Sequence, residues 1–588
     1  MNKQNETLRT TFVKAFESYK NKDYKNAEIH CYKILSIDPN HIDSLSMLAT
    51  ISAINGNFEK AKGFLKQVIE IEPNNLTILQ NLGTAHKELG EFDEAIKLYN
   101  KVLNINPKHT NSNYNLGLVF YKLNDLEKAK SYLKKTVEIQ KNYALAFFSL
   151  ANVHSDLKEY NDAVSCYQKS IEINPNLPGA HNNLGLIFRI LNDLENAISC
   201  YKKAIELKSD HAGAYHNLAL TLKDLGQFDE AIKYHQKAIK YEPENLAHFH
   251  FISELKKDVL DENLKNKIKN ILSSEKCTKN NLAYGNFLLA KFERKDKNYE
   301  KEFSYLIKGH DSFFKARGKR FELGVKYCFD DVLQISNGAK VNKTNIKKYG
   351  DIAPIFIIGV PRCGSTLVEK IIGSGNKTIP IGEETAILEN YINKKVLEKQ
   401  SLNLGNVDEV REELYSIYKE KGLLLTKNDP IFTDKSLNNF FYLELINEIF
   451  PKAKIINCKR EALSSIVSIF QNNLTELAWT HDLDHIFKYF NNYFEIIENY
   501  NSIYPEKIYN LKFEDLLNEP EKVSKKLMTF CNLPWSKRCL EFYKRKDLIS
   551  KTASNVQIRQ AIFKHSPERY LPYKKLLSKF NKNYLWFN

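Results

Sequence analysis

Residues 354–366 read PIFIIGVPRCGST, and this stretch indicates how the second half of the chain folds. The isoleucine-rich run 354–358 is typical of a strand buried on both faces of a parallel sheet. A glycine-containing loop follows at 359–364, and helical character begins near Ser365. Backbone N–H groups of such a loop, together with a helix N-terminus, point toward an oxyanion. The stretch therefore predicts an α/β domain with a central parallel sheet and a phosphate cradle.

The loop has the spacing of the P-loop pattern GxxxxGK[ST] with one change. Gly359 and Gly364 occupy the glycine positions and Thr366 the last position, but Ser365 stands where the lysine belongs. An NTPase needs that lysine for its β- and γ-phosphates, so hydrolysis of ATP or GTP is disfavoured. Arg362, earlier in the loop, remains as a cation for a smaller anionic group.

The first half of the chain repeats every 34 residues. Prolines mark this spacing, with Lys141 and Ser209 at the two positions that lack one. An alanine stands twelve residues before each mark, and alanine or glycine stands twenty-four before. The prolines are Pro39, Pro73, Pro107, Pro175 and Pro243; the alanines are Ala27, Ala61, Ala95, Ala129, Ala163, Ala197 and Ala231; the small residues are Ala15, Ala49, Gly83, Gly117, Ala151, Gly185 and Ala219. This pattern predicts two antiparallel helices per repeat, with small residues where the helices cross.

The pattern resembles the tetratricopeptide repeat (TPR), with seven copies over 8–245. Stacked copies bury the apolar faces that single pairs cannot, which implies an all-α superhelix. The 34-residue pattern is absent over 246–350. Apolar residues there keep a helical spacing, which indicates a helical connector or cap. The third domain is expected over 351–588. Such arms bind peptides or partner proteins, so we expect a peptide or protein in the groove.

Asparagine recurs two residues before the small residue in four repeats, at Asn81, Asn115, Asn183 and Asn217. Repeat spacing predicts a row of amides on one face, and an amide can donate to and accept from a peptide backbone. A similar ladder lines the arm of O-linked GlcNAc transferases, which implies substrate binding here. The alternative is that these amides are satisfied within the repeats.

Three residues that follow the loop in the sequence are further candidates for binding an anionic group. Lys435 follows the extended segment 431–434, Arg460 ends the apolar strand expected at 454–459, and Ser468 lies two helical turns further. A guanidinium offers phosphate a directional fork that stays charged. The order of motifs over 351–588 is similar to that of TPR-containing bacterial sulfotransferases and of tyrosylprotein sulfotransferases.

That resemblance implies 3′-phosphoadenosine 5′-phosphosulfate (PAPS) as co-substrate. The loop would hold the 5′-phosphosulfate, and Arg460 with Ser468 the 3′-phosphate. Phe513 replaces the tyrosine of the family's strand-to-helix turn and would lie near the adenine. The segment 551–560, followed by 566–570, resembles the motif that covers the cofactor. The implied cofactor-binding residues are Arg362, Cys363, Gly364, Ser365, Thr366, Arg460, Ser468, Phe513, Ser554, Gln557 and Arg559.

Residues 382–385, Gly-Glu-Glu-Thr, have the letters of the acidic catalytic motif of tyrosylprotein sulfotransferases. The resemblance makes Glu384 the general base. Because one extra residue separates the loop from this motif, Glu383 remains a rival and a substrate-binding candidate. Arg362 and Lys435 would stabilise charge on the transferred group. We expect no metal, because sulfate transfer carries less charge than phosphoryl transfer.

These patterns predict a PAPS-dependent sulfotransferase acting on a hydroxyl, and a protein tyrosine presented by the arm is the first candidate. The alternative is sulfation of a glycan, lipid or small molecule, with the arm as a protein-interaction scaffold.

Bulk composition agrees with a folded multidomain protein, with 43% apolar residues over 588 positions and a formal charge of +15. Nine cysteines without a CxxC pair favour a reducing compartment, and the N-terminus lacks the apolar core of a signal peptide. The apolar run 352–360 is about half of a membrane span. We therefore expect a cytoplasmic protein without a membrane span or a nucleic-acid partner.

Overall fold

The computed structural model describes residues 2–342, 352–375, 379–424, 431–545, 549–562 and 570–587. The chain separates into two compact units, Met1–Leu218 and Ala219–Asn588. The division falls inside helix α13 (Ala212–Asp224), so the end of that helix belongs to the second unit.

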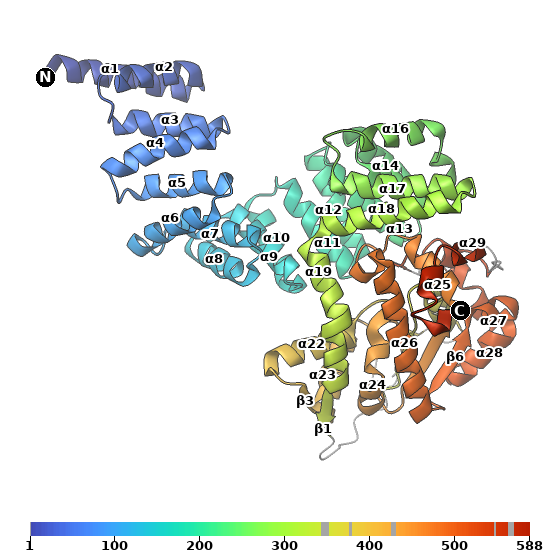
Figure 1. Ribbon diagram of the computed structural model, residues 1–588. Helices are drawn as coiled ribbons and strands as arrows, with labels where there is room; N and C mark the ends of the chain where they lie inside the picture. The colour runs from blue at the N-terminus through green and yellow to red at the C-terminus, as the bar shows by residue number, and fades with distance from the viewer. Residues whose placement is uncertain are drawn as a thin grey trace. The chain divides into compact units, whose positions relative to one another are not determined.

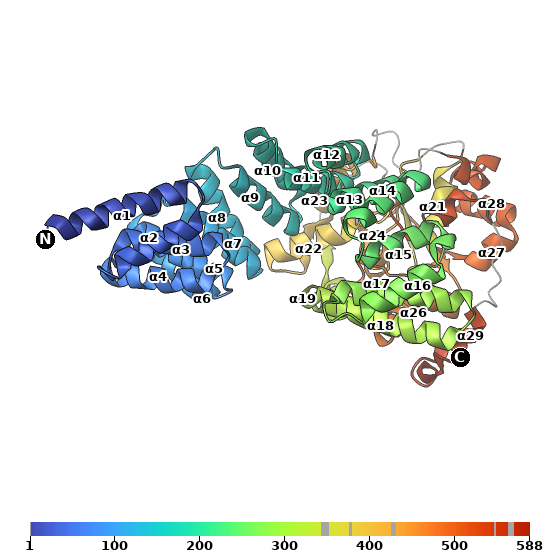
Figure 2. The same cartoon turned by 90° about the horizontal axis from the view of Figure 1, so that it is seen from above.

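Antiparallel helix pairs build the first unit, and Figures 1 and 2 show them stacked one pair on the next. The TPR prediction is confirmed by this arrangement. The helices are α1 (Asn2–Lys20), α2 (Tyr24–Leu35), α3 (Ile42–Ile54), α4 (Phe58–Ile71), α5 (Leu76–Glu88), α6 (Phe92–Ile105), α7 (Thr110–Lys122), α8 (Leu126–Ile139), α9 (Ala144–Asp156), α10 (Tyr160–Ile173), α11 (Pro178–Ile190), α12 (Leu194–Leu207) and the start of α13.

The small residues of the repeat lie where paired helices touch. A Cβ added at Gly83 would meet Tyr99 at 2.8 Å, and one at Gly117 would meet Leu133 at 2.6 Å. The alanines of the second helices are equally enclosed, since Ala95 and Ala129 have no exposed surface. A larger side chain at these positions would push the helices apart, which explains the lattice read from the sequence.

The second unit begins with the end of α13 and continues through helices that connect to the sheet. These are α14 (Phe228–Tyr241), α15 (Leu246–Leu255), α16 (Glu262–Leu272), α17 (Lys279–Lys295), α18 (Tyr299–Arg317), α19 (Lys319–Lys326) and α20 (Val332–Gly338). Helices α17 and α18 lie side by side in both views (Figures 1 and 2).

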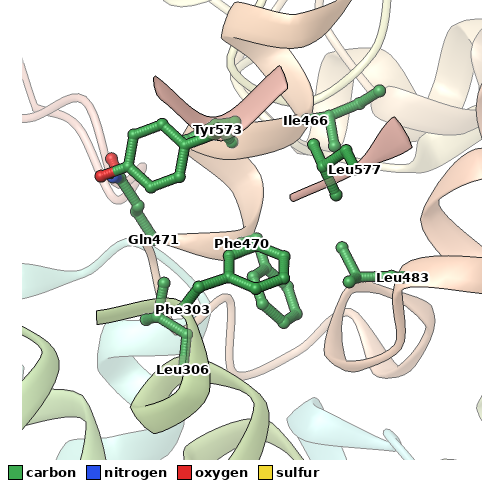
Figure 3. A pocket seen from close by; sticks show the side chains of 9 residues that line it. Phe303, Leu306, Ile466, Phe470, Gln471, Leu483, Tyr573 and Leu577 are labelled. Carbon is green, nitrogen blue, oxygen red and sulfur yellow. The ribbon is translucent and has the colours of Figure 1, made fainter. Parts of the chain in front are cut away.

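Helix α18 packs on the sheet domain through an apolar contact drawn in Figure 3. Phe303 and Leu306 of α18 face Ile466 and Phe470 of α25 (Ala462–Phe470), with Leu577 nearby. The gap among these side chains does not admit a water molecule. It is a seam of the core, and none of the predicted site residues lines it.

Within the described residues, four parallel strands form the central sheet in the order β4-β2-β5-β6. They are β4 (Thr433–Asp434), β2 (Ile355–Ile358), β5 (Lys454–Lys459) and β6 (Ile508–Lys512). In register, Ile355 faces Thr433 on one side and Lys454 on the other, and Lys459 faces Lys512. Every residue of β2 is buried, as the apolar run predicted. The α/β fold with a parallel sheet is confirmed.

Helices surround this sheet, and a small parallel pair joins β1 (Lys340–Asn342) to β3 (Asn403–Asn406). The helices are α21 (Ser365–Gly373), α22 (Ile387–Lys399), α23 (Val407–Glu420), α24 (Leu443–Ile449), α25, α26 (Leu483–Ile503), α27 (Phe513–Asn518), α28 (Pro520–Phe530) and α29 (Leu571–Lys574). Among the residues described, no helix combines the length and apolarity that crossing a membrane requires.

Candidate functional site

The four central strands run the same way, so their carboxyl ends meet at one edge, where open α/β sheets bind ligands. The loop 359–364 follows β2, Lys435 follows β4, Arg460 follows β5 and Phe513 follows β6. Four residues that the sequence singled out at separate places are thereby delivered to a common edge.

The loop after β2 has the tight backbone that its glycines allow. Gly364 has φ +97°, and a Cβ there would lie 2.3 Å from the ring of Phe513. Gly364 therefore leaves room for that ring against the start of α21. Arg362, with φ +68°, also adopts the left-handed conformation, which costs energy for a residue that carries a Cβ. The loop is a strained turn held by its surroundings.

Arg362 is the centre of the cationic half of the site. Its Nε donates to Ser468 Oγ at 3.1 Å, its Nη1 to Ser554 Oγ at 2.8 Å, and its Nη2 to Gln557 Oε1 at 3.3 Å. The structure thus brings together four residues predicted from three distant motifs.

Arg460 contacts the same loop from the next strand. Its Nη1 donates to the carbonyl oxygen of Arg362 at 2.8 Å, and its Nη2 to Tyr570 Oη at 3.4 Å. The guanidinium carbon lies 5.1 Å from the ring centre of Phe513 and 5.6 Å from that of Tyr570. Two aromatic rings therefore hold this cation at the site edge. The predicted residues 566–569 lie outside the described part of the chain.

The remaining loop residues are enclosed. Cys363 is buried beside Cys458, whose thiol hydrogen bond lowers the pKa of Cys363. Ser365 and Thr366 are buried at the first turn of α21, and Thr366 Oγ1 lies 3.5 Å from Thr552 Oγ1. Cys363, Ser365 and Thr366 are therefore packed inside the protein.

Lys435 joins the acidic half of the site. Its Nζ lies 2.6 Å from Glu384 Oε1 and 3.9 Å from Glu383 Oε1. The backbones also pair, since Glu384 N donates to the Lys435 carbonyl at 2.6 Å and Lys435 N to the Gly382 carbonyl at 2.9 Å. Burial alone would lower the pKa of Lys435, but Glu384, Glu383 and Glu369 outweigh it and raise that pKa. Lys435 therefore stays a cation in a buried setting.

The two candidate glutamates differ in their surroundings. Glu383 is 10% exposed and accepts from Ser550 Oγ at 3.0 Å, with Lys370 Nζ 3.6 Å away. Glu384 is 36% exposed and is bound by Lys435. The carboxylate of Glu384 is the more accessible to an incoming hydroxyl, and Glu383 is tied into the protein.

Sequence reasoning missed Glu369 and Lys370, which lie under this network. Glu369 is completely buried and accepts from Thr433 Oγ1 at 2.7 Å, with Lys370 Nζ 3.9 Å from its other oxygen. Burial raises the pKa of Glu369 to about 7. A charged pair inside the apolar helical stretch 367–372 was the available signal, because such pairs are rarely buried without a role.

Arg559, predicted to cover the cofactor, contacts another part of the unit. Its Nη2 donates to the carbonyl of Asp224 at 3.1 Å, and its Nε to Asn555 Oδ1 at 3.0 Å. The side chain lies over Gly226, beyond the end of α13.

The asparagines of the repeat arm make contacts within the first unit. Asn115 is buried, accepts from Lys87 Nζ at 2.9 Å and donates to the carbonyl of Asn111 at 2.9 Å. Asn183 donates to Asn152 Oδ1 at 3.0 Å, and Asn217 donates to Asn182 Oδ1 at 3.0 Å. Asn81 is half-buried on α5. Asn115, Asn183 and Asn217 thus each bond to a side chain of the preceding repeat.

Comparison with known proteins matches residues 354–537 to the model of the sulfotransferase family. Tetratricopeptide-repeat models match residues 74–142, 144–177 and 212–245. Separate parts of the chain thus match tetratricopeptide repeats and the sulfotransferase family, which confirms the resemblance seen in the motifs.

Curated relatives extend this similarity. An uncharacterized protein of Aquifex aeolicus (strain VF5) is 30% identical over 53% of this chain and 42% of its own length. Protein-tyrosine sulfotransferase 1 of Danio rerio is 30% identical over 34% of this chain and 58% of its own length. The chain thus spans about half the length of these relatives. The crystal structure of MamA is 30% identical over 28% of this chain and 95% of that chain, with a TM-score of 0.27.

Proposed function

We propose that this protein is an enzyme that transfers a sulfuryl group from PAPS to an acceptor hydroxyl. The observation that carries the proposal is the meeting of Arg362 and Arg460 at two neighbouring strand ends, joined by a hydrogen bond of 2.8 Å. The match of 354–537 to the sulfotransferase family supports the same chemistry.

The donor set fits a nucleotide that is charged at both ends of its ribose. Arg362, with the N-terminus of α21 behind it, suits a 5′-phosphosulfate, and Arg460 with Ser468 suits a 3′-phosphate. Phe513 offers an aromatic face for an adenine, and its ring occupies the space that a side chain at Gly364 would fill. PAPS supplies the sulfuryl group that the acceptor oxygen takes.

The acid–base half of the site provides the remaining chemistry. Glu384 accepts the proton of the acceptor hydroxyl, because its carboxylate is the more exposed of the pair. Lys435, held as a buried cation, stabilises negative charge that develops on the departing oxygen. Arg362 stabilises negative charge on the sulfuryl oxygens. The backbone N–H groups of the loop hold the sulfuryl group in line with the attacking oxygen.

The acceptor that we favour is a tyrosine of a protein or peptide bound by the repeat arm. Relatives named protein-tyrosine sulfotransferases support a phenol acceptor, whose pKa of about 10 makes it easier to deprotonate than an alkyl alcohol. Repeats of this kind bind extended peptides, and Asn81, Asn115, Asn183 and Asn217 are our candidates for backbone contacts. A reducing, cytoplasmic setting agrees with nine free cysteines, all within the described ranges.

Incubation with ³⁵S-labelled PAPS and a lysate of the source cells tests the proposal. We expect label in protein, recovered as sulfotyrosine after hydrolysis. Arg362→Ala and Lys435→Ala should each lower the incorporation by about 10²–10³-fold. Arg411→Ala is the matched control, since Arg411 donates to the carbonyls of Ile449 and Glu448 away from the site.

Label found only in glycan, lipid or small molecules would replace the tyrosine acceptor with the alternative while keeping sulfuryl transfer. Absence of label from all fractions, with PAPS left intact, would contradict the proposed function.

A further inference from the structure

The segment 549–562, called the covering segment below, touches both halves of the candidate site. Ser554 accepts from Arg362 at 2.8 Å, and Gln557 accepts from the same guanidinium at 3.3 Å. At its other end, Ser550 donates to Glu383 at 3.0 Å, and the Ile549 carbonyl accepts from Lys370 at 3.2 Å. The position of this segment therefore sets the partners of both Arg362 and Glu383.

The same segment is fastened on its other side to the end of α13. Asn555 Nδ2 donates to the carbonyl of Lys223 at 2.9 Å, and Arg559 Nη2 donates to that of Asp224 at 3.1 Å. Ser550 N also donates to the Asp224 carbonyl, at 3.3 Å. Asn555 and Asp224 are 1% and 3% exposed, so these contacts are shielded from water. The carbonyls belong to the negative end of a helix dipole, which favours a guanidinium.

A glycine makes this contact possible. Gly226 has φ +77° in the turn after α13, and a Cβ there would lie 2.2 Å from Arg559 Cζ. Gly56 and Gly90 occupy the same position in other repeats, with φ +74° and +79°, and each faces open space. The turn itself accepts other residues, since Lys22, Asn124, Lys158 and Asn192 hold the same position in further repeats with φ between +60° and +68°. Glycine is therefore needed at 226 for the close approach of Arg559.

The end of α13 is itself held firmly. Lys223 Nζ lies 2.7 Å from Glu254 Oε2 of α15, and its Nζ lies 5.7 Å from the ring centre of Phe251. Burial alone would raise the pKa of Glu254, but Lys223 and its other cationic neighbours hold that pKa well below its usual value. The end of α13, to which the covering segment is bonded, is therefore held by an ion pair to α15.

We infer that the turn between the two helices of the seventh repeat, residues 223–226, is part of the cofactor site, because it holds the covering segment in place through Asn555 and Arg559. This inference rests on the proposed function, since the segment matters through the anion that Arg362 binds. Arg559 is then a positioning residue that acts through Ser554 and Gln557, in place of the direct contact with the cofactor expected from its motif. A domain boundary placed after the last repeat would cut through the site.

The pair Gly226→Ala and Gly90→Ala tests the inference on the full-length protein. Both variants place alanine in the same left-handed turn, but only the first drives a methyl group into Arg559. The first measurement is the affinity for 3′-phosphoadenosine 5′-phosphate by titration calorimetry. We expect Gly226→Ala to weaken binding by up to about a hundredfold, as misplacement of site groups by an ångström does, and Gly90→Ala to bind like the wild type.

The second measurement is hydrogen exchange of peptides from 549–562 without nucleotide. Exchange should rise in Gly226→Ala and stay unchanged in Gly90→Ala. This readout does not depend on nucleotide binding, so it separates the two proposals. A wild type that fails to bind the nucleotide contradicts the proposed function, whereas wild-type exchange in Gly226→Ala overturns the anchoring itself.

Arg559→Ala supplies the internal check. Once the guanidinium is removed, adding Gly226→Ala should weaken nucleotide binding no further, because nothing remains for the methyl group to displace. Additive losses would mean that Gly226 acts through the turn alone and would overturn the role given to Arg559. Where Gly226→Ala does not fold, Asn555→Asp takes its place, because it keeps the acceptor for Arg559 and loses the donor to Lys223.

Discussion

The guanidinium of Arg460 donates to the backbone carbonyl of Arg362, so one arginine holds the strained turn that presents the other. The two cations come from adjacent parallel strands, which fixes their separation through the sheet. A ligand with two anionic groups on one ribose matches this pairing.

Arg460→Ala should abolish discrimination between PAPS and its 3′-dephosphorylated analogue. Losing a charged fork to phosphate removes about 2–3 kcal/mol of binding, or roughly 30- to 150-fold in the ratio of kcat/KM values. Arg460→Lys should recover part of the preference, because a single ammonium replaces the fork. Steady-state kinetics with both donors measures the effect, and an unchanged ratio would refute the role.

Glu384→Gln should lower kcat by about 10²–10⁴-fold, the range that a general base contributes. Glu383→Gln should have the smaller effect on kcat, because Glu383 is bound by Ser550 and Lys370 instead of facing the acceptor. Single-turnover rates at saturating PAPS measure the chemical step in both variants. A larger loss in the Glu383 variant would reverse the assignment of the base.

Glu369→Gln should change how stability depends on pH. Burial raises the pKa of Glu369 from 4.5 to about 7, so the folded state holds a proton that the unfolded state has released. The stability from this group is complete below pH 4.5 and is lost as the pH rises through 7. Glutamine does not titrate, so its stability does not fall in this way. Between pH 4.5 and pH 8 the free energy of unfolding of the variant should therefore rise by about 3 kcal/mol relative to that of the wild type.

Urea unfolding of both proteins at several pH values measures this difference. Glutamine can still accept from Thr433 Oγ1, so the comparison removes the titration and keeps that bond. The charged neighbours Lys370, Lys435 and Glu383 are the same in both proteins. A difference in unfolding free energy that does not vary with pH would show that folding does not raise the pKa of Glu369.

A buried histidine pair should make the second unit sensitive to acid. His310 Nδ1 and His481 Nδ1 are 2.9 Å apart, and His310 Nε2 donates to the Phe470 carbonyl at 2.8 Å. Burial lowers the pKa of His310 to about 4, and burial together with His310 lowers that of His481 to about 2. Both rings therefore stay neutral when folded, with Asp482 and Arg317 as the charged neighbours.

Stability from this pair is present above pH 6.5 and falls as the pH drops toward 4, because the unfolded histidines take up protons first. The loss amounts to about 3 kcal/mol for His310 alone. His481→Phe keeps the ring that stacks on Phe313 at 4.9 Å and removes one titrating group. Its melting temperature should fall less steeply between pH 6.5 and pH 4 than that of the wild type, and equal slopes would contradict the prediction.

Local sequence signals gave the elements and the residues at their ends. The 34-residue lattice predicted the helix pairs, because each small residue marks a contact between neighbours in sequence, such as Gly83 with Tyr99. The run 354–358 predicted the central strand, and the residues after each strand end were found because parallel strands share one edge. The buried residues Glu369 and Lys370 were not predicted, because a Glu-Lys pair on a helix ordinarily faces water.

The repeat arm and the parallel sheet could be predicted from the sequence, since they depend on periodicity and on groups close in the chain, and the same local signals pointed to the candidate anion-binding residues. Which residues touch could be learned only from the folded chain, because contacts such as Arg362 with Ser554 or Asp224 with Arg559 join positions 192 and 335 residues apart. The folded chain also shows how Glu383 and Glu384 differ, since their exposure depends on Lys370 and Ser550, which arrive from other segments. Local propensity specifies an element, whereas burial and charge pairing are properties of the packed whole.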